Sequence, residues 1–223
     1  MRPDGLPHKR PHFDNWQRSP PVSTEPPKPP EPLTGGVKYK LSDHCTLVMW
    51  KGDIVIWHVD GQTDAIVAPA NKKVNAGLGI NGAIHRAAGP RLADAGAKLP
   101  DMAPQGVKCV IGAAVVTRAF NLKVSRVIHA VAPVYQERDD ASPRDLNSAY
   151  RSALELANRE GVKYICFAAM SCGLYGYPYD EAAEIALTQC LRNHGDIREV
   201  HFVLKEQDYY DTWLDEAKRI FKC

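Results

Sequence analysis

Six short apolar runs alternate with helical patterns between residue 37 and the C-terminus, and this alternation limits the possible folds more than any other feature. The runs lie at residues 46–51, 64–68, 108–117, 126–131, 164–170 and 199–204. Several of them are apolar without interruption, which is typical of strands that are covered on both faces. The pattern predicts an α/β fold in which helices cover a mostly parallel sheet.

The helical patterns lie among these runs, at residues 80–97 (with a break at Gly89-Pro90), 180–193 and 208–221, and before Gly161. The helix before Gly161 is the best marked. Ser142 is its expected N-cap, Pro143 suits its first turn, and Gly161 follows its end. Its apolar residues fall on one stripe, as in a helix that packs against a sheet.

Composition changes sharply near Gly35-Gly36. Residues 1–36 contain ten of the 17 prolines, so we expect a largely disordered tail with polyproline II character. The folded domain is expected to cover residues 37–223. The run PPKPPEP in the tail resembles ligands of SH3 or WW domains, although a solvated spacer is the simpler interpretation.

The charge balance and the lengths of the apolar stretches argue against nucleic-acid and membrane partners. The chain has 223 residues, 28 of them basic and 26 acidic, for a net charge of +2, which gives no electrostatic footprint for nucleic acid. No apolar stretch reaches the length of a membrane span, and the N-terminus lacks the apolar segment of a secretory signal. We expect a monomer in the cytoplasm or the nucleus, without membrane or nucleic-acid partners.

The six cysteines predict packed thiols rather than disulfides or a metal site. They contain no CxxC pair, and several lie inside apolar runs. The histidines are equally dispersed, and the short paired spacings of a zinc site are absent. We therefore expect neither a metal nor a cofactor. The cysteines are Cys45, Cys109, Cys166, Cys172, Cys190 and Cys223.

Ligands of open α/β sheets bind beyond the carboxyl ends of the strands, so the loops that follow the strands are the candidate sites. The first is Gly52-Asp53-Ile54, directly after the run at residues 46–51. Its glycine lets a ligand approach the backbone, and its carboxylate can accept a hydrogen bond from an exocyclic amine. A carboxylate that only closes a turn is an equally good interpretation of Asp53.

The second loop, residues 71–82, joins a strand end to a helix start, where backbone N–H groups can face an anion. Gly77, Gly79 and Gly82 spell GxGxxG, and Asp101 follows at about the distance of a dinucleotide-binding fingerprint. That interpretation is the weaker one, because residues 69–76 separate the strand from the first glycine. Asp101 also lies in a stretch that is typical of a loop.

The third loop, residues 171–178, lies between a buried run and a helix that we expect to be capped by Asp180. Its two glycines and short polar residue, next to a helix start, are typical of an anion-binding loop. Its tyrosines can cover a sugar or a base. Cys172 is a possible nucleophile, but no histidine or carboxylate is spaced to activate it, so a packed cysteine is expected.

Together the loops resemble the macrodomain family, in particular its MacroD-like branch as found in plants, which includes proteins that process ADP-ribose 1″-phosphate (Appr-1-p). The similarity runs from about residue 37 to the C-terminus. It implies a three-layer α/β/α sandwich with a mixed, mostly parallel sheet and a site for ADP-ribose. Such domains bind ADP-ribosylated proteins or hydrolyse ADP-ribose esters. The matching stretches are Lys51-Gly52-Asp53-Ile54 and residues 64–71 (DAIVAPAN), 82–90 (GAIHRAAGP), 126–129 (RVIH) and 171–178 (SCGLYGYP).

The resemblance implies a role for each loop. Asp53 would accept a hydrogen bond from the adenine amine, and the Ile54 backbone would contact the adenine edge. Asn71 and the loop at residues 79–81 would line the distal ribose and the diphosphate. The third loop would hold the phosphates through its amides, with Tyr175 shielding the distal ribose. The implied contacts with ADP-ribose are Asp53, Ile54, Asn71, Gly79, Ile80, Asn81, Ser171, Cys172, Gly173, Leu174, Tyr175 and Gly176.

Three positions depart from the family's pattern. Ala68 replaces the first of two asparagines. Ala76-Gly77-Leu78-Gly79 replaces a run of four glycines, and its side chains leave a ligand less room to approach the backbone. Asn81 stands where hydrolytic members carry an aspartate that positions or activates the attacking water. An amide has no titratable group and cannot act as a general base.

The pattern also bears on adenine stacking and on catalysis. Lys205 stands where relatives place an aromatic ring that stacks on adenine, and Phe202 and Tyr209 are the candidates to replace it. Asn81 and His85 are the candidate catalytic residues, because each can assist an attacking water by hydrogen bonding.

Three functions fit these observations. We predict a module that binds ADP-ribose or mono-ADP-ribosylated targets with weak or absent catalysis, which Asn81 favours. The alternative is a hydrolase of mono-ADP-ribosyl esters or O-acetyl-ADP-ribose, in which the substrate's own phosphate holds the water. A third possibility is a domain whose site takes another ligand or none and whose tail carries the function.

Overall fold

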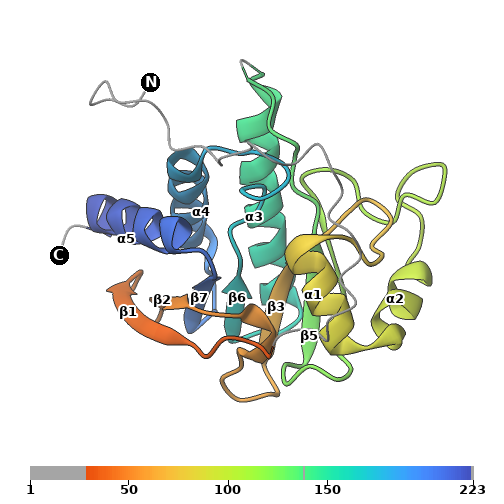
Figure 1. The fold of residues 1–223 in the computed structure, drawn as a ribbon, viewed down its shortest axis with the longest axis horizontal. Coiled ribbons are helices and arrows are strands. Elements are labelled where there is room, and N and C mark those ends of the chain that lie inside the picture. The colour runs from red at the N-terminus through yellow and green to blue at the C-terminus, as the bar shows by residue number, and fades with distance from the viewer. Residues whose placement is uncertain (1–28, 138, 222–223) are drawn as a thin grey trace.

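The computed structural model describes residues 29–137 and 139–221. They form one seven-stranded sheet with helices on both sides (Figure 1). The strands are β1 (Thr34–Lys40), β2 (Thr46–Lys51), β3 (Asp64–Pro69), β4 (Ala114–Arg118), β5 (Arg126–Ala130), β6 (Tyr164–Phe167) and β7 (Glu199–Leu204). The helices are the 3-10 helix η1 (Ile54–Ile56) and the α-helices α1 (Gly79–Ala88), α2 (Pro90–Ala97), α3 (Ala141–Arg159), α4 (Tyr179–Asn193) and α5 (Gln207–Phe221).

The sheet is mixed and mostly parallel, as predicted. Its strand order is β1-β2-β7-β6-β3-β5-β4. The pairs from β2 to β5 are all parallel, whereas β1 and β4 join the two edges in the antiparallel sense. The carboxyl ends of five neighbouring strands therefore lie along one edge of the sheet.

Helices cover both faces of this sheet and complete a three-layer α/β/α sandwich (Figure 1). α3, α4 and α5 pack on one face, and α1 and α2 pack on the other. Side chains of β3 alternate between the two hydrophobic clusters: Val67 belongs to the first, and its neighbours Ile66 and Ala68 belong to the second. Both faces of the central strands are apolar because both are covered.

The predicted strand at residues 108–117 is wrong over its first half, because β4 begins only at Ala114. The preceding residues form turns, and the backbone N–H groups of Lys108 and Cys109 both donate to the Lys72 carbonyl. Cys109 is nevertheless buried, in a small cluster of loop residues. Burial inside a loop thus produced an apolar run that resembles a strand.

The prediction that Ser142 caps α3 is also wrong, because the helix already includes Ala141. The Asp139 carboxylate accepts a hydrogen bond from the Ala141 N–H at 3.0 Å. Ser142 Oγ instead accepts from the Gln136 N–H at 3.3 Å. A carboxylate satisfies a free N–H at a helix start and also interacts favourably with the helix dipole, which explains the earlier start.

The folded part of the chain begins earlier than predicted. β1 starts at Thr34, so the expected boundary after residue 36 falls inside a strand. Thr34 pairs with Lys51 and Gly35 pairs with Trp50, and an irregularity follows Gly35. Leu33 packs on the hydrophobic cluster at the α1 face. Proline and glycine are depleted in strands, so this composition hid the strand.

Of the disordered tail predicted at residues 1–36, residues 1–28 lie outside the described residues. Among the described helices, none combines the length and the apolar character needed to cross a membrane. Over the same ranges, no group of three or more His, Cys, Asp or Glu side chains is arranged to hold a metal ion. The cysteines that the structure describes are free and buried: Cys45, Cys109, Cys166, Cys172 and Cys190.

Residues 29–36 should contribute measurably to stability. Removal of residues 1–36 deletes two pairings of β1 and the side chain of Leu33, at a cost of about 1–2 kcal/mol. For a domain of this size the melting temperature should fall by roughly 2–8 °C. Scanning calorimetry measures the change, with removal of residues 1–28 alone as the control. Equal melting temperatures for the two truncations would mean that the fold begins at residue 37.

Candidate functional site

The predicted site residues gather along the edge where the parallel strands end. Asp53 follows β2, residues 171–176 lie beyond β6, and Asn71 follows β3. Three strand spacings separate β2 from β3 in the sheet order, which corresponds to about 14 Å at about 4.8 Å per step. The site therefore extends along the sheet edge and suits an elongated ligand.

Asp53 closes the turn between β2 and η1. Its Oδ1 accepts a hydrogen bond from the Val55 N–H at 3.2 Å, and its Oδ2 lies 3.6 Å from Lys205 Nζ. The Asp53 side chain keeps 16% of its exposure, whereas the Ile54 side chain is buried in the cluster under η1. The Asp53 carboxylate therefore closes the turn, and its Oδ2 faces Lys205. Ile54 is able to meet a ligand only through its backbone.

Asn71 and Asn81 meet at one backbone carbonyl. The Nδ2 groups of Asn71 and Asn81 both donate to the Asn75 oxygen, at 3.1 Å and 3.0 Å. Oδ1 of Asn71 is used as well, because it accepts from the N–H groups of Lys73 and Asn75. Oδ1 of Asn81 has no hydrogen-bond partner among the described residues, although this side chain is only 5% exposed. The loop therefore contains one buried acceptor that a ligand or a water can satisfy.

The glycines of the second loop fold it onto α1. A Cβ on Gly77 would lie 2.9 Å from Nδ2 of Asn81, and a Cβ on Gly82 would overlap the Gly77 carbonyl oxygen. Asp101, the other part of the dinucleotide fingerprint, pairs with Lys108 at 2.7 Å. It does not follow a strand. The dinucleotide interpretation is wrong, because Gly77 and Gly82 serve internal packing and Asp101 lies in a loop.

α1 begins without a side-chain cap. Leu78 occupies the N-cap position, forms no side-chain hydrogen bond and is 78% exposed. Gly79 starts the helix with φ +58°, in the left-handed region that favours glycine. The first backbone N–H groups of a helix have no intrahelical partner, and they carry the positive end of its dipole. Gly79, Ile80 and Asn81 thus bring N–H groups to the same sheet edge as Asn71.

The third loop begins with a strained serine. Ser171 has φ +63°, which residues other than glycine rarely adopt. Its Oγ donates to the Pro133 carbonyl at 2.7 Å, and its own carbonyl accepts from the Tyr177 N–H at 3.0 Å. These bonds hold the backbone in its unusual conformation. α4 begins at Tyr179, so the prediction that Asp180 caps it is wrong, and Asp180 lies in its first turn.

Backbone hydrogen bonds hold the rest of this loop on both sides of its tip. The Gly176 N–H donates to the Gly173 carbonyl at 2.9 Å, which closes the turn. The Tyr135 N–H donates to the Tyr175 carbonyl at 2.9 Å and links the loop to the segment after β5. Leu174 is exposed at the tip. Hydrogen bonds therefore fix the backbone of this loop on both sides of its exposed tip.

Cys172 lies inside this loop but is fully buried. Its Sγ donates to the Met170 carbonyl at 3.4 Å, and burial raises the pKa of the thiol well above its usual range. A thiol of this kind does not form the thiolate that a nucleophile requires. The alternative of a catalytic cysteine is wrong, and Cys172 contributes to the site only through its backbone.

One of the two proposed replacements for the stacking aromatic ring is wrong. Phe202 is fully buried and stacks on Phe167, with ring centroids 5.5 Å apart. Tyr209 is half-buried, and its hydroxyl donates to the Cys172 carbonyl at 3.0 Å. The side chain that reaches the end of the site at Asp53 is Lys205, which keeps 49% of its exposure.

His85 lies one turn after Asn81 on α1, and it is buried. Neither of its ring nitrogens has a partner among the described residues, and burial lowers its pKa. Its ring centroid is 6.1 Å from that of His129, whose Nε2 bonds Thr117 Oγ1 at 2.9 Å. Burial is the main cause and the neighbouring His85 the smaller cause of the low pKa of His129, which is about 3. Both imidazoles are therefore neutral at pH 7.

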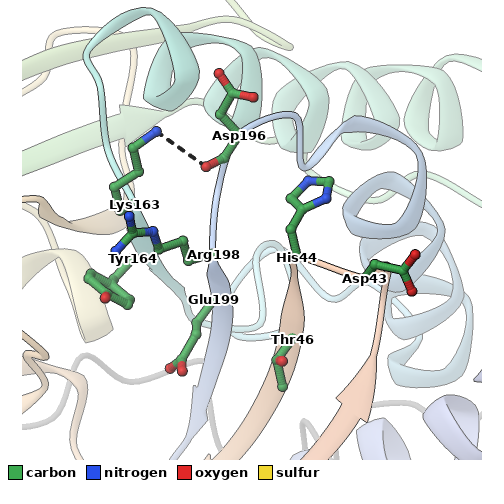
Figure 2. A pocket seen from close by; sticks show the side chains of 8 residues that line it. All are labelled: Asp43, His44, Thr46, Lys163, Tyr164, Asp196, Arg198 and Glu199. Carbon is green, nitrogen blue, oxygen red and sulfur yellow. Dashed lines mark hydrogen bonds between the residues drawn. The ribbon is translucent and has the colours of Figure 1, made fainter.

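Two cavities elsewhere in the described structure do not include these loops. One, of about 500 Å³, lies where β2, β6 and β7 begin, at the opposite ends of the strands (Figure 2). Charges of both signs line it, and Lys163 Nζ donates to the Asp196 carbonyl at 3.4 Å. The other, of about 640 Å³, lies between α2 and β4. Because neither cavity includes the three loops, the candidate site is identified by its hydrogen-bonding groups and not by a cavity.

Sequence reasoning missed two contacts at Asp53. The sequence shows Lys205 only as a departure from the family's pattern, because its ion pair with Asp53 depends on how β2 and β7 align. The Glu31 carbonyl accepts from the Asp53 N–H at 3.2 Å. No pattern in the sequence indicates this bond, since residue 31 belongs to the proline-rich stretch.

A family model described as Macro domain matches residues 67–186. A macro domain-containing protein of Vibrio parahaemolyticus is 40% identical over 163 residues, which cover 73% of this chain and 92% of that protein. An O-acetyl-ADP-ribose deacetylase of Salmonella gallinarum is 40% identical over 171 residues, which cover 77% of this chain and 89% of that enzyme.

Among solved structures, the Oceanobacillus iheyensis macrodomain with ADP matches with a TM-score of 0.76 and 31% identity, covering 83% of this chain and 96% of that one. Three single variants of that macrodomain also match. They replace an asparagine by alanine, a glycine seven residues later by valine (with ADPR), and an aspartate three residues after that by alanine.

The buried imidazole of His129 should make stability depend on pH. Its pKa is about 3 in the folded chain and about 6.5 in the unfolded chain. Between these values only the unfolded chain binds the proton, so the free energy of unfolding falls by about 1.4 kcal/mol for each unit of decreasing pH. We expect His129→Gln to remove this slope between about pH 6 and pH 4. Urea unfolding measures it, with exposed His58→Gln as the control. Parallel profiles for the wild type and His129→Gln would contradict the assignment.

Proposed function

The chain belongs to the macro domain family, and we propose that it binds ADP-ribose or mono-ADP-ribosylated proteins with weak or absent catalysis. Relatives support the ligand: one is named an O-acetyl-ADP-ribose deacetylase, and a solved macrodomain with a similar fold carries ADP. The elongated arrangement of donors and acceptors along the sheet edge supports the same ligand class.

The groups along the edge suit the parts of ADP-ribose in order. The Asp53 carboxylate and the Ile54 backbone, beyond β2, suit the adenine. The uncapped start of α1 and the loop at residues 171–176 suit the diphosphate, because free N–H groups and a helix dipole favour an anion. Asn71 and Asn81 suit the hydroxyl groups of the distal ribose.

The buried acceptor of Asn81 is the observation that carries this proposal. Oδ1 has no partner among the described residues and little exposure, and leaving such an atom unsatisfied costs about 1–3 kcal/mol. A ribose hydroxyl that donates to it would remove that cost. The other end of the amide is already bonded to Asn75, so the orientation of the acceptor is set before the ligand binds.

Weak catalysis follows from the same side chain. The replaced asparagine, glycine and aspartate of the Oceanobacillus macrodomain have the spacing of Asn71, Leu78 and Asn81. This supports the view that an aspartate of the relative is an asparagine here. An amide can orient a water but cannot take its proton. His85 is neutral and buried, so it supplies no charge to the reaction.

The loop is also adjusted to an amide. The Asn81 Nδ2 donates to the Asn75 carbonyl at 3.0 Å. A carboxylate oxygen in its place would face that carbonyl with no proton between two acceptors. The conformation at residue 75 therefore favours asparagine over aspartate, which supports a binding role.

A hydrolase is the second candidate, and the names of the relatives favour it. O-acetyl-ADP-ribose deacetylases of several bacteria are 37–40% identical to this chain. In that case the substrate's own phosphate would hold the attacking water, and Asn81 Oδ1 would accept a hydrogen bond from it. The reaction would then proceed without a side-chain base.

Adenine recognition should depend on Asp53. A hydrogen bond to a charged group contributes about 1.5–3 kcal/mol, so Asp53→Ala should weaken ADP-ribose binding by roughly ten- to a hundredfold. Isothermal titration calorimetry measures the affinity. The matched control is Lys205→Met, which removes the other member of the ion pair and keeps the carboxylate. An Asp53→Ala protein that loses stability but keeps its affinity would mean that the side chain only closes the turn.

Asn81→Asp tests whether the missing carboxylate limits catalysis. General-base assistance contributes about 10²–10⁴ in rate, so we expect the variant to hydrolyse O-acetyl-ADP-ribose at least about tenfold faster than the wild type. ADP-ribose affinity should fall, because the new charge faces the diphosphate and the Asn75 carbonyl. Turnover is measured as the release of acetate, which is monitored by chromatography.

Asn71→Asp is the control for this experiment, because it introduces the same charge on the neighbouring amide that bonds Asn75. It should bind more weakly without a gain in rate. A wild type that already turns over as fast as Asn81→Asp would favour the hydrolase. A wild type that does not bind ADP-ribose at all would overturn the proposed function.

A further inference from the structure

The stretch of chain before β1 lies against the adenine end of the proposed site. The Asp53 N–H donates to the Glu31 carbonyl at 3.2 Å. The Leu33 side chain packs, half-buried, on the hydrophobic cluster that includes Ile54, and Val55 packs on the same cluster. Residues 31–33 are thus attached to the Asp53 turn by a backbone hydrogen bond and an apolar contact.

Gly52 makes this close approach possible. A Cβ at this position would lie 2.5 Å from the Pro32 carbonyl oxygen and 3.0 Å from Cδ2 of Leu33, and its φ of +144° suits glycine. The Gly52 N–H donates to the Leu204 carbonyl at 3.2 Å. The backbone of the first loop is therefore held between the end of β7 and residues 31–33. The space that glycine creates is taken by the chain itself.

The segment leaves the carboxylate of Asp53 accessible. It contacts the Asp53 backbone, whereas the carboxylate oxygens face the Val55 N–H and the ammonium of Lys205. The Lys205 ammonium is 3.6 Å from the Asp53 carboxylate, and the Lys205 side chain is about half exposed, so water or a ligand can reach the pair. The contacts of residues 31–33 therefore control where the carboxylate and the Ile54 backbone point and do not block them.

We infer that residues 31–33 are a positioning segment for recognition of the base, which holds the Asp53 turn in the conformation that accepts adenine. The inference rests on the proposed function. Ordering a mobile turn during binding costs conformational entropy, so a turn that is held beforehand binds more tightly. It also discriminates better, because a fixed carboxylate cannot turn away from a base that presents an oxygen in place of the exocyclic amine.

The test uses the full-length chain with Leu33→Ser, which weakens the apolar contact of the segment. Titrations with ADP-ribose and with its hypoxanthine analogue, inosine diphosphate ribose, measure affinity and base preference. We expect ADP-ribose binding to weaken roughly three- to tenfold, and the preference for adenine to fall by a similar factor. Hydrogen exchange of the Asp53 amide, monitored by NMR, should be faster in Leu33→Ser than in the wild type.

The matched control is Val37→Ser, which also replaces an aliphatic side chain by serine, at a position of β1 that is 38% exposed. It should leave both affinities and the Asp53 exchange rate unchanged. If Leu33→Ser leaves the Asp53 amide protected from hydrogen exchange, the double variant with Pro32→Gly and Leu33→Gly is used for the same comparison of affinities and exchange rate. A purely structural role would lower both affinities by the same factor and leave the base preference unchanged.

Three outcomes separate the inference from the proposed function. An unchanged base preference, despite faster exchange at Asp53, overturns the inference and leaves ADP-ribose binding in place. Tighter binding by the variant also overturns it, because residues 31–33 would then cover the site. A wild type that binds neither nucleotide overturns the proposed function and the inference together.

Discussion

The parallel hydrogen bonding of β2, β7, β6, β3 and β5 is the constraint on which the site depends. Parallel neighbours require crossover connections, and these crossovers place helices on both faces of the sheet. The same arrangement brings the carboxyl ends of all five strands to one edge. Residues as distant in the chain as Asp53, Asn71, Ser171 and Lys205 therefore lie along a single line, and each is carried by the end of a rigid strand or the loop beyond it.

At the end of this line near α1, the chemistry is that of neutral amides. Asn71 and Asn81 share the Asn75 carbonyl, and α1 begins with N–H groups that no side chain caps. The imidazoles beneath them are neutral because burial disfavours their charged forms. Groups of this kind bind hydroxyls and phosphates well. They are poor at removing a proton from water, so the geometry agrees better with binding than with catalysis.

The other end of the line, at Asp53, is charged. Lys205 neutralises part of the carboxylate's field at the position where the family's pattern has an aromatic ring, and residues 31–33 hold the backbone beneath it. The two ends thus use different physical means. The end near α1 depends on hydrogen bonds within one loop, whereas the end at Asp53 depends on contacts between β2, β7 and the chain before β1. Changes near the N-terminus can therefore alter the Asp53 turn without disturbing the end near α1.

The sequence alone determined the layered α/β fold, the family and the three loops, because these depend on local features. Uninterrupted apolar runs indicate strands that are covered on both faces, and glycines next to strand ends mark the loops. The absence of a carboxylate at Asn81 is equally visible. The same local rules misplaced the strand at residues 108–117, since a buried loop is apolar too, and they missed β1, since its glycines and the prolines before it are typical of a tail.

Only the tertiary structure decided which of these groups meet. The ion pair of Lys205 with Asp53 depends on the parallel register of β2 and β7. The bond from Asp53 to Glu31 joins segments with no shared pattern, and the neutrality of His85 results from burial under the assembled sheet edge. Such contacts leave no periodic trace in the sequence. They depend on the relative placement of elements, which is established only when the sheet has formed.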